Sequence, residues 1–291
     1  MDIYVQLLVN SLQIGAVYVL FSLGLTLIFG VMRIVNFAHG EFFALAALLV
    51  AVAVPWMIDF GAPLPVAYGL AFLGALAGVL VLGKILYEFA FRRFQRDMIG
   101  SFVLSVGLAL LLQGLFIEIF TGASRKLPTL IEGTLRILGG AITTQRLVLC
   151  VIALLVAAGM YWAIASTRLG KALRAVSEDH EAAMLQGIPY RRIALSGFLI
   201  GTLLAAVAGA LLAPVVVIGP VIGSSYLIKG FIAVVIGGLG SIPGAIIGSI
   251  LIAVIESVGG YYFDPSLATI AMFVMVMVVL LVRPAGIMGN G

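Results

Sequence analysis

The sequence has few charged residues and a single cysteine. Lys, Arg, Asp and Glu make up 10% of its 291 residues, whereas 63% are hydrophobic and the mean hydropathy is +1.27. Soluble domains carry about a quarter charged residues, so this composition excludes a soluble protein and predicts a polytopic membrane protein. Cys150, alone in an apolar run, excludes an intrachain disulfide and a cysteine metal cluster. We expect it to serve packing.

The sequence also lacks the motifs of an energy-converting or catalytic site. The nearest string to a phosphate-binding loop runs from Gly78 to Gly83 and Lys84, but Ile85 replaces the required Ser or Thr and the context is apolar. Metal-ligand spacings and a nucleophile elbow are missing too. We therefore expect no catalytic residue, no metal site and no cofactor on this chain. The net charge of +4 does not indicate nucleic-acid binding, because membrane proteins keep excess Lys and Arg in cytoplasmic loops.

What is abundant is apolar sequence in segments of membrane-spanning length. A helix needs about 20 apolar residues to cross a bilayer. The first segment lacks the basic start of a cleavable signal, and we expect it to be retained. The sequence thus predicts an all-α fold, a single transmembrane domain over residues 1–291 built as a polytopic helical bundle with about eight spans. The expected spans are 5–29, 41–57, 66–91, 99–120, 146–166, 193–217, a broken segment 226–258, and 265–282.

The distribution of Lys and Arg predicts the orientation of the spans. Most of these residues fall in the loops 84–97 and 168–192, with Arg283 in the C-terminal tail. The positive-inside rule assigns these segments to the cytoplasm and the N-terminus to the opposite side. The residues expected on the outer side are Arg125, Lys126, Arg136, Arg146 and Lys229.

Two interruptions of apolar sequence predict broken helices. The one nearer the C-terminus, the second interruption, covers residues 237–244 and reads GGLGSIPG, and Gly and Pro do not sustain a helix cheaply. Broken helices at membrane depth are buried in protein or line a wet cavity. A re-entrant pair of half-helices and two full spans joined by a tight turn are both compatible with the pattern. We expect Gly244 and Gly248 to serve close helix packing, and the candidate residues for a translocation path or gate here are Gly237, Gly238, Gly240 and Ser241.

The first interruption, residues 30–41, lies nearer the N-terminus and concentrates ionisable groups next to a span. Charged groups at membrane depth are expensive and often mark pathways or helix-end contacts. One interpretation is a capped helix junction, with Asn36 as the cap and Glu41 in the first turn. The other is a part of the substrate path or gate, and its candidate residues are Asn36, Phe37, His39 and Glu41. The two interruptions could also mark a weak internal repeat of the kind from which transporters build their sites.

The polar loop 168–192 carries the densest charge pattern in the chain. A first amphipathic stretch precedes a short helix expected from Ser177 to Gly187. Ser177 is its expected cap, acidic side chains occupy its first turns, and Gly187 and Pro189 end it. A solvated cytoplasmic loop is the plain alternative. The candidate docking residues are Ser177, Glu178, Asp179, Glu181, Ala182, Ala183 and Gly187.

The Glu181-Ala182-Ala183 triplet, followed after three residues by Gly187, resembles the "EAA" loop of ABC importer permeases. Other strings extend the likeness over residues 8–287: GLTLIFG at 24–30, NFAHGEFF at 36–43, GKALRA at 170–175, GGLGSIPGA at 237–245 and RPAGI at 283–287. Together they resemble the branched-chain amino acid ABC permease family, LivH-type subunit. Ala46-Ala47-Leu48 departs from the Gly-Ala-Tyr of many relatives.

The resemblance implies a membrane-spanning permease subunit of an ABC importer in the bacterial inner membrane, with the loop 168–192 as a cytoplasmic coupling loop. It implies as partners a homologous LivM-type permease, two ABC ATPase subunits that bind ATP and Mg²⁺, and a periplasmic substrate-binding protein. Branched-chain amino acids are the expected substrates. A self-contained channel or secondary transporter, or a permease of this family for urea or another small organic solute, is the alternative.

Overall fold

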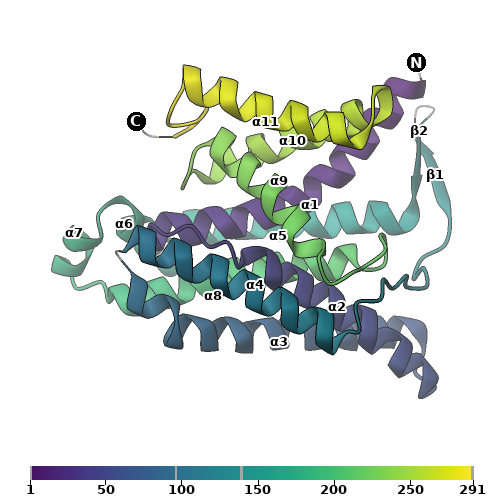
Figure 1. Ribbon diagram of the computed structural model, residues 1–291, viewed down its shortest axis with the longest axis horizontal. Coiled ribbons are helices and arrows are strands. Elements are labelled where there is room, and N and C mark those ends of the chain that lie inside the picture. The colour runs from purple at the N-terminus through teal and green to yellow at the C-terminus, as the bar shows by residue number, and fades with distance from the viewer. Residues whose placement is uncertain (1, 96, 138–139, 290–291) are drawn as a thin grey trace.

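The computed structural model describes residues 2–95, 97–137 and 140–289, and most of these are helical (Figure 1). The polar loop 168–192, which we call the coupling loop, folds into α6 (Arg168–Glu178) and α7 (His180–Leu185). It lies between α5 (Thr144–Ser166) and α8 (Tyr190–Leu212). In order, the elements are α1 (Asp2–Met32), α2 (His39–Asp59), α3 (Leu64–Phe89), the 3-10 helix η1 (Phe91–Phe94), α4 (Met98–Ile119), β1 (Thr134–Ile137), β2 (Gly140–Thr143), α5 (Thr144–Ser166), α6 (Arg168–Glu178), α7 (His180–Leu185), α8 (Tyr190–Leu212), α9 (Ile222–Gly237), α10 (Ile242–Tyr262) and α11 (Pro265–Val282).

Eight helices within the described residues are long and apolar enough to cross a membrane: α1 to α5, α8, α10 and α11. They run roughly along the long axis of the molecule, and α6 and α7 project from one end of it (Figure 1). α1 begins at the opposite end, whereas α11 finishes at the end that carries α6 and α7. The expected polytopic helical bundle is confirmed.

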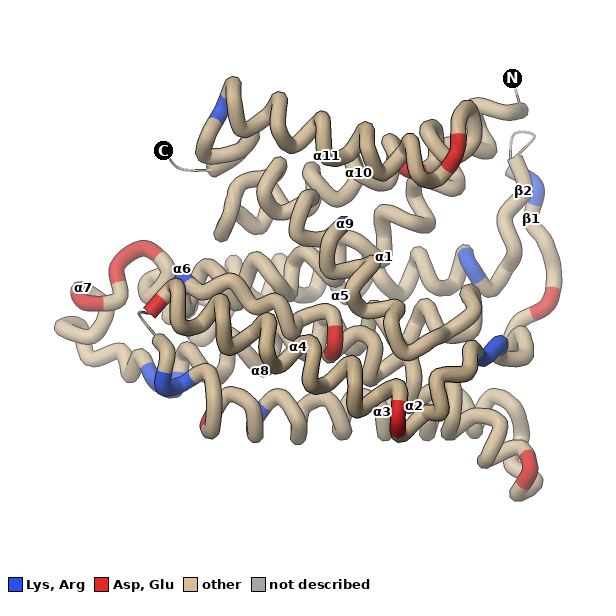
Figure 2. The backbone as a smooth tube through the Cα atoms, in the orientation of Figure 1, with Lys and Arg blue, Asp and Glu red and all other residues tan. Residues whose placement is uncertain are grey.

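The bundle is organised around α1, which packs against α5, α8, α9 and α10. Leu20, Phe21 and Ile28 on α1 are fully buried. The outer helices instead expose large apolar side chains, such as Leu155 of α5 and Leu281 of α11, which is 81% exposed. Such a surface suits lipid, because hydrocarbon side chains are as apolar as lipid tails. Charged residues lie mainly at the ends of the bundle (Figure 2).

The segment expected to be broken at 237–244 is an antiparallel pair of unequal helices. α10 is long enough to span a bilayer, whereas the 16 residues of α9 cover only about 24 Å at 1.5 Å per residue. The break lies between them, where Gly238 and Gly240 have positive φ values of 111° and 86°. The structure is therefore neither a pair of matched half-helices nor two spans of equal length.

The α9–α10 contact depends on glycines, as expected from the sequence. A Cβ added to Gly248 would lie 2.0 Å from the carbonyl oxygen of Ala233, and one added to Gly244 would lie 2.2 Å from that of Gly237. No side chain fits these distances, so the two backbones touch directly. The expected packing role of Gly244 and Gly248 is confirmed.

The segment expected to be an outer loop, residues 121–145, contains a short antiparallel hairpin. Thr134 pairs with Thr143 and Arg136 with Ala141. Arg125 forms a bridge with Ile218, the residue that precedes α9 by a few positions. This contact fixes the start of α9 to the end of the bundle opposite α7.

Candidate functional site

The short helix in the coupling loop is α7, and its cap is Asp179. The Asp179 carboxylate accepts hydrogen bonds from the backbone N–H groups of Glu181 (2.9 Å) and Ala182 (3.0 Å). The N–H groups of Ala182 and Glu181 lower the pKa of the Asp179 carboxyl group, because they stabilise its charged form. Glu181 occupies the first turn, where its negative charge interacts favourably with the positive end of the helix dipole.

The expectation that Ser177 caps this helix is wrong. Ser177 lies in the last turn of α6, where its hydroxyl donates to the carbonyl oxygen of Arg174 at 2.8 Å. Glu178 is the last residue of α6. The helical conformation is interrupted at Asp179, whose backbone is extended (φ −149°, ψ 106°). The expected single stretch 177–187 is therefore the end of one helix and the whole of another.

The end of α7 follows the sequence-based expectation. Gly187 has φ +80° and takes the left-handed conformation that turns the chain away, and Pro189 is the N-cap of α8. Ala182 is exposed and Ala183 is buried. Leu185, which the motif search did not select, is 87% exposed at the tip of the loop.

A hydrogen bond from the first interruption fixes the base of the coupling loop. Arg33 follows α1 with a left-handed backbone (φ 55°), unusual for a side chain with a Cβ. Its guanidinium donates to the carbonyl oxygen of Ser177 at 2.7 Å. That carbonyl belongs to the last turn of α6, directly before the break at Asp179. The first interruption and the coupling loop are thus joined by one contact.

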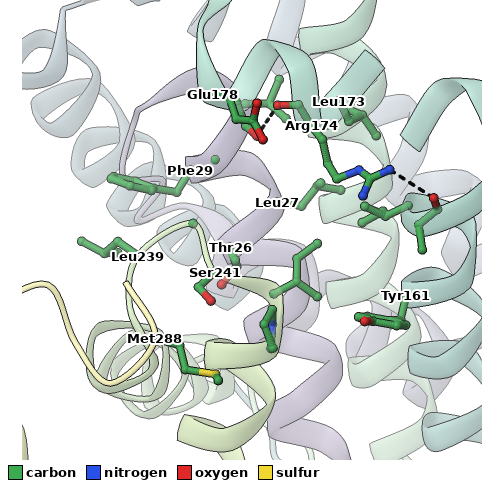
Figure 3. Close-up of a pocket in the computed structure, with 18 of the residues that line it drawn as sticks. Thr26, Leu27, Phe29, Tyr161, Leu173, Arg174, Glu178, Leu239, Ser241 and Met288 are labelled. Carbon is green, nitrogen blue, oxygen red and sulfur yellow. Dashed lines mark hydrogen bonds between the residues drawn. The ribbon is translucent and has the colours of Figure 1, made fainter. Parts of the chain in front are cut away.

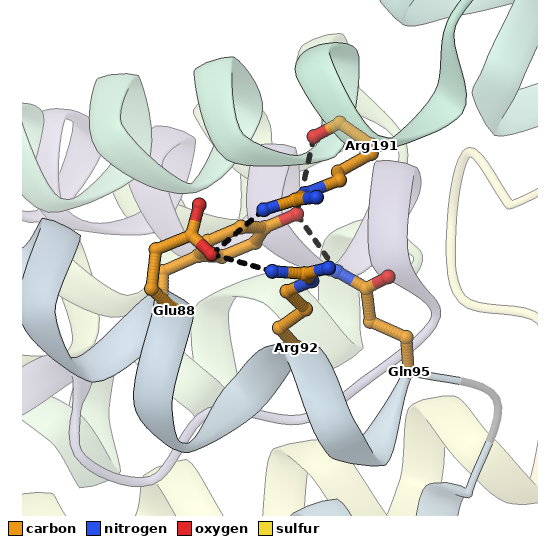
Figure 4. Close-up of polar contacts among 5 residues, drawn as sticks. Glu88, Arg92, Gln95 and Arg191 are labelled. Atoms are coloured by element: carbon orange, nitrogen blue, oxygen red, sulfur yellow. Dashed lines mark hydrogen bonds and ion pairs between the residues drawn. The ribbon is translucent and has the colours of Figure 1, made fainter.

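A second contact joins the other end of the loop to α3 (Figure 4). The carboxylate of Glu88 on α3 forms ion pairs with the guanidinium groups of Arg92 (2.9 Å) and of Arg191 on α8 (3.1 Å). The Tyr87 hydroxyl donates to the carbonyl oxygen of Arg191, and the Gln95 amide donates to that hydroxyl. Glu88 and Arg92 form an i,i+4 pair, and Arg191 joins it at the first turn of α8.

A pocket of about 590 Å³ opens between α1, α5, α6 and the α9–α10 turn (Figure 3). Thr26 and Phe29 come from α1, Tyr161 from α5, and Ser241 from the start of α10. Arg174 of α6 crosses the mouth of the pocket and donates to the carbonyl oxygen of Ala165 at 3.1 Å. The pocket therefore contains parts of the coupling loop and of both interruptions.

The two interruptions touch each other beside this pocket. A Cβ added to Gly30 would lie 3.8 Å from the carbonyl oxygen of Gly240, and one added to Gly240 would lie 3.7 Å from the Cα of Gly30. The sequence indicates that the two interruptions could be corresponding parts of an internal repeat, but it does not predict that they touch each other. This contact brings residues that are more than 200 positions apart in the sequence into one continuous surface.

The path residues of the first interruption are buried in the bundle and do not line this pocket. Asn36 and His39 are fully buried, and Glu41 is 3% exposed in the first turn of α2. The Asn36 side chain accepts the Ala38 N–H at 3.0 Å, whereas the N-cap of α2 is Ala38. Asn36 therefore braces the turn before the helix, and the expectation that it caps α2 is wrong. Phe37 packs its ring between those of Phe102 and Phe231.

Three of these buried side chains carry polar atoms with no hydrogen-bond partner among the described residues: Asn36 Nδ2, His39 Nδ1 and Glu41 Oε2. Burying an unpaired polar atom is costly. The Nε2 atom of His39 lies 3.2 Å from the carbonyl oxygen of Phe21. A site that tolerates such a cost is a candidate for function.

The path residues of the second interruption have structural roles. Gly237 packs against the backbone of Gly244, and Gly238 against that of Gly289. Ser241 caps α10, accepting the Gly244 N–H at 3.2 Å. Of this set, Gly240 and Ser241 also line the pocket.

Sequence reasoning missed a charged cluster inside the bundle. Lys229, expected on the outer side, lies in the middle of α9, and its ammonium is 2.5 Å from the Glu256 carboxylate of α10. Tyr18 of α1 donates to the other carboxylate oxygen. The signal that could have found the cluster is one acid and one base inside neighbouring apolar runs.

Comparisons with known proteins agree with this arrangement. The family described as "branched-chain amino acid transport system / permease component" matches residues 7–282. The high-affinity branched-chain amino acid transport system permease protein BraD of Pseudomonas aeruginosa is 32% identical, over 99% of this chain and 96% of its own. LivH of Escherichia coli, with the same description, is 31% identical over the same shares of both chains. A probable LivH permease of Methanocaldococcus jannaschii is 30% identical over 93% of this chain and 88% of its own.

The family match covers nearly all the described helices, from within α1 to the end of α11. The loop motif therefore lies in a chain that resembles these permeases throughout its length, and the chain belongs to the family of branched-chain amino acid transport system permease components.

Proposed function

We propose that this chain is a membrane-spanning subunit of an ABC importer and that α7 docks into a separate ATPase subunit. The observation that carries the proposal is the geometry of α7. It is a short capped helix held outside the bundle, with Glu181, Ala182 and Leu185 exposed. Small alanines permit close approach, while the acidic and apolar side chains offer contacts to a partner.

The anchors of the loop support a route for coupling. Arg33 joins the loop to the end of α1, and Arg191 joins it to α3 through Glu88. A movement of α7 driven by the ATPase would therefore act on the contact between Gly30 and Gly240 beside the inner pocket. In this proposal the pocket opens and closes at the cytoplasmic side, and the buried Asn36, His39 and Glu41, together with the partly buried Phe37, belong to the path or its gate.

The proposed substrates are branched-chain amino acids, because several relatives that match along nearly the whole chain carry that substrate in their names. The proposed assembly contains a homologous LivM-type permease, two ABC ATPases that bind ATP and Mg²⁺, and a periplasmic binding protein. The proposed location is the bacterial inner membrane, with α7 in the cytoplasm and the start of α1 on the periplasmic side.

Reconstitution tests this proposal. This chain is purified together with its partner permease and the ATPases, and the complex is reconstituted in liposomes. The binding protein is placed inside the liposomes in one experiment and outside them in another. We expect leucine uptake that requires ATP on the side of α7. Uptake by this chain alone, without an ATPase, would indicate a self-contained carrier and contradict the proposal. ATP-driven uptake of urea or another solute in place of leucine would contradict only the substrate.

A further inference from the structure

The Lys229–Glu256 pair lies deep in the bundle. Tyr18, which contacts Glu256, is 16 residues from the start of α1 and 14 from its end. At 1.5 Å per residue it is about 24 Å and 21 Å from the two ends. This is near the middle of a hydrocarbon layer about 30 Å thick. Glu256 itself lies six residues, about 9 Å, from the end of α10, so the charges lie within the hydrocarbon layer but toward one side of it. Charges within this layer are expensive and commonly mark a substrate or ion pathway.

The two charges are held differently. The Glu256 carboxylate is bound on both oxygens, by Lys229 on Oε1 and by the Tyr18 hydroxyl on Oε2. Lys229 directs one of its three N–H donors to Glu256, and its ammonium lies 6.0 Å from the centre of the Tyr18 ring. Both charged side chains remain 25% exposed. The pair is therefore partly accessible, and Lys229 donates to no second acceptor among the described residues, so its other N–H groups can bind one.

Aromatic rings surround the pair on one side. Tyr18 meets Tyr226 edge to face at 5.7 Å, and Tyr226 stacks on Phe43 of α2 at 4.5 Å. These rings join the charged pair to the start of α2, which carries the buried His39. Tyr18 and Phe43 are buried, whereas Tyr226 is partly exposed. The Tyr226 ring beside one positive and one negative group has the complementary chemistry of an α-amino acid with a hydrocarbon side chain.

A purely structural role explains these charges poorly. Pairing two ions in an apolar interior seldom gives net stability over neutral residues of similar size, because desolvation offsets the attraction. The glycine contacts already hold α9 against α10 without it, since the backbones touch at Gly244 and Gly248. The charges are not needed to join the two helices.

We propose that Lys229 and Glu256 form an exchange site for the zwitterionic headgroup of the transported amino acid. The substrate carboxylate takes the free donors of Lys229, and its ammonium takes Glu256, which Tyr18 keeps in place. The resting ion pair replaces these contacts when the substrate leaves, so neither charge is left alone in the membrane. This inference rests on the proposed function, because it concerns the substrate of that importer.

The test uses the complete importer in liposomes with labelled leucine. The double variant Lys229→Met/Glu256→Gln removes both charges and keeps similar volumes, which a structural pair tolerates. We expect uptake to fall at least about tenfold, because hydrogen bonds to two charged groups are lost. ATP hydrolysis without binding protein should stay within about twofold. The control variant Lys84→Met/Glu118→Gln removes the same charges from exposed helix positions and should transport normally.

Each other outcome has a meaning. Normal uptake by the double variant overturns the site, and so does a parallel loss of uptake and ATP hydrolysis, which would indicate a structural clamp. If the wild-type importer takes up another solute but no leucine, the proposed substrate fails instead, and if it takes up no solute with ATP, the proposed function fails.

A chemical rescue keeps the inference testable if the double variant does not assemble. In Lys229→Cys, the thiol forms a mixed disulfide with either reagent and releases methanesulfinate: 2-aminoethyl methanethiosulfonate adds an aminoethylthio group and restores an ammonium, whereas methyl methanethiosulfonate adds only a neutral methylthio group. The natural Cys150 is 2% exposed and is shielded. We expect uptake to return with the amine reagent alone and leucine to slow the modification. Equal effects of the two reagents, or no protection by leucine, would overturn the proposal.

Discussion

The guanidinium of Arg33 donates to the carbonyl oxygen of Ser177 at 2.7 Å, and this bond joins the end of α1 to the last turn before the coupling helix. Replacing Arg33 with Met removes the bond. A net contribution of about 1 kcal/mol would change the population of the coupled state about fivefold. We expect leucine uptake per ATP hydrolysed to fall by a similar factor, measured in liposomes containing the complete importer.

Arg33→Lys and Arg33→Gly provide the controls for that experiment. Lysine keeps a charged donor and should retain part of the coupling. Glycine relieves the left-handed backbone (φ 55°) but lacks the donor, so it should behave like Met. Normal coupling in both Met and Gly variants would remove the bond from the coupling route.

Gly187 turns the chain away from the coupling helix with φ +80°, and a Cβ there would meet nothing within 4 Å. A substitution is therefore opposed by backbone strain alone, about 1–2 kcal/mol for a β-branched residue. We expect Gly187→Val to lower uptake per ATP hydrolysed while the protein still inserts in the membrane. Gly187→Asn is the matched control, because Asn tolerates this conformation; equal effects of Val and Asn would contradict the explanation.

Glu181 lies in the first turn of α7 with its side chain 76% exposed. Glu181→Gln keeps the shape and removes the charge offered to the ATPase. We expect weaker coupling of uptake to ATP hydrolysis, with unchanged insertion. Glu132→Gln, in the segment at the other end of the bundle, is the charge-matched control. Equal coupling in wild type and Glu181→Gln would exclude a charged contact at this residue.

Leu185 is 87% exposed at the tip of the coupling loop. Burying a leucine side chain in a partner contributes about 1.5–3 kcal/mol, which corresponds to at least about a tenfold change in affinity. We expect Leu185→Asp to weaken binding of the ATPase subunits by that factor in a pull-down titration. Leu185→Met keeps the apolar volume and should bind normally; unchanged binding by the Asp variant would place Leu185 outside the contact.

The cap of α7 gives a prediction for pH. The N–H groups of Ala182 and Glu181 lower the pKa of Asp179, so its contribution to helix stability is complete above the ordinary aspartate pKa of about 3.9. It is lost only as the pH falls through the lowered pKa. Asp179→Asn still accepts hydrogen bonds. Between pH 5 and pH 8, roughly, wild type and Asp179→Asn should therefore show parallel pH profiles of ATPase binding. Divergence within that range would mean that the charge acts on the partner.

The sequence-based predictions succeeded where the signal is local. Gly187 and Pro189 act on their own backbone, and the turn and the next helix start where these residues predict. The cap was misassigned to Ser177, whereas the residue that caps α7 is Asp179, two positions later. Which one caps α7 depends on where α6 ends, and α6 is extended by its packing of Leu173 and Val176 against the bundle.

Contacts between distant segments were beyond the sequence. Lys229 and Glu256 are 27 positions apart, and their pairing exists only because α9 and α10 fold back on each other. Gly30 and Gly240 meet for the same kind of reason. The sequence marked each interruption as unusual, but the partner of each follows from the packing of α1 against α9 and α10.

The direct backbone contact between α9 and α10 limits how this transporter can move. With the carbonyl oxygens of Ala233 and Gly237 set against Gly248 and Gly244, neither helix can rotate or slide by one residue without driving a Cβ into main-chain atoms. Any movement of the α9–α10 hairpin is therefore a movement of both helices together as one rigid body. Its hinges then lie outside it, in residues 213–221 before α9 and at Phe263 and Asp264 after α10.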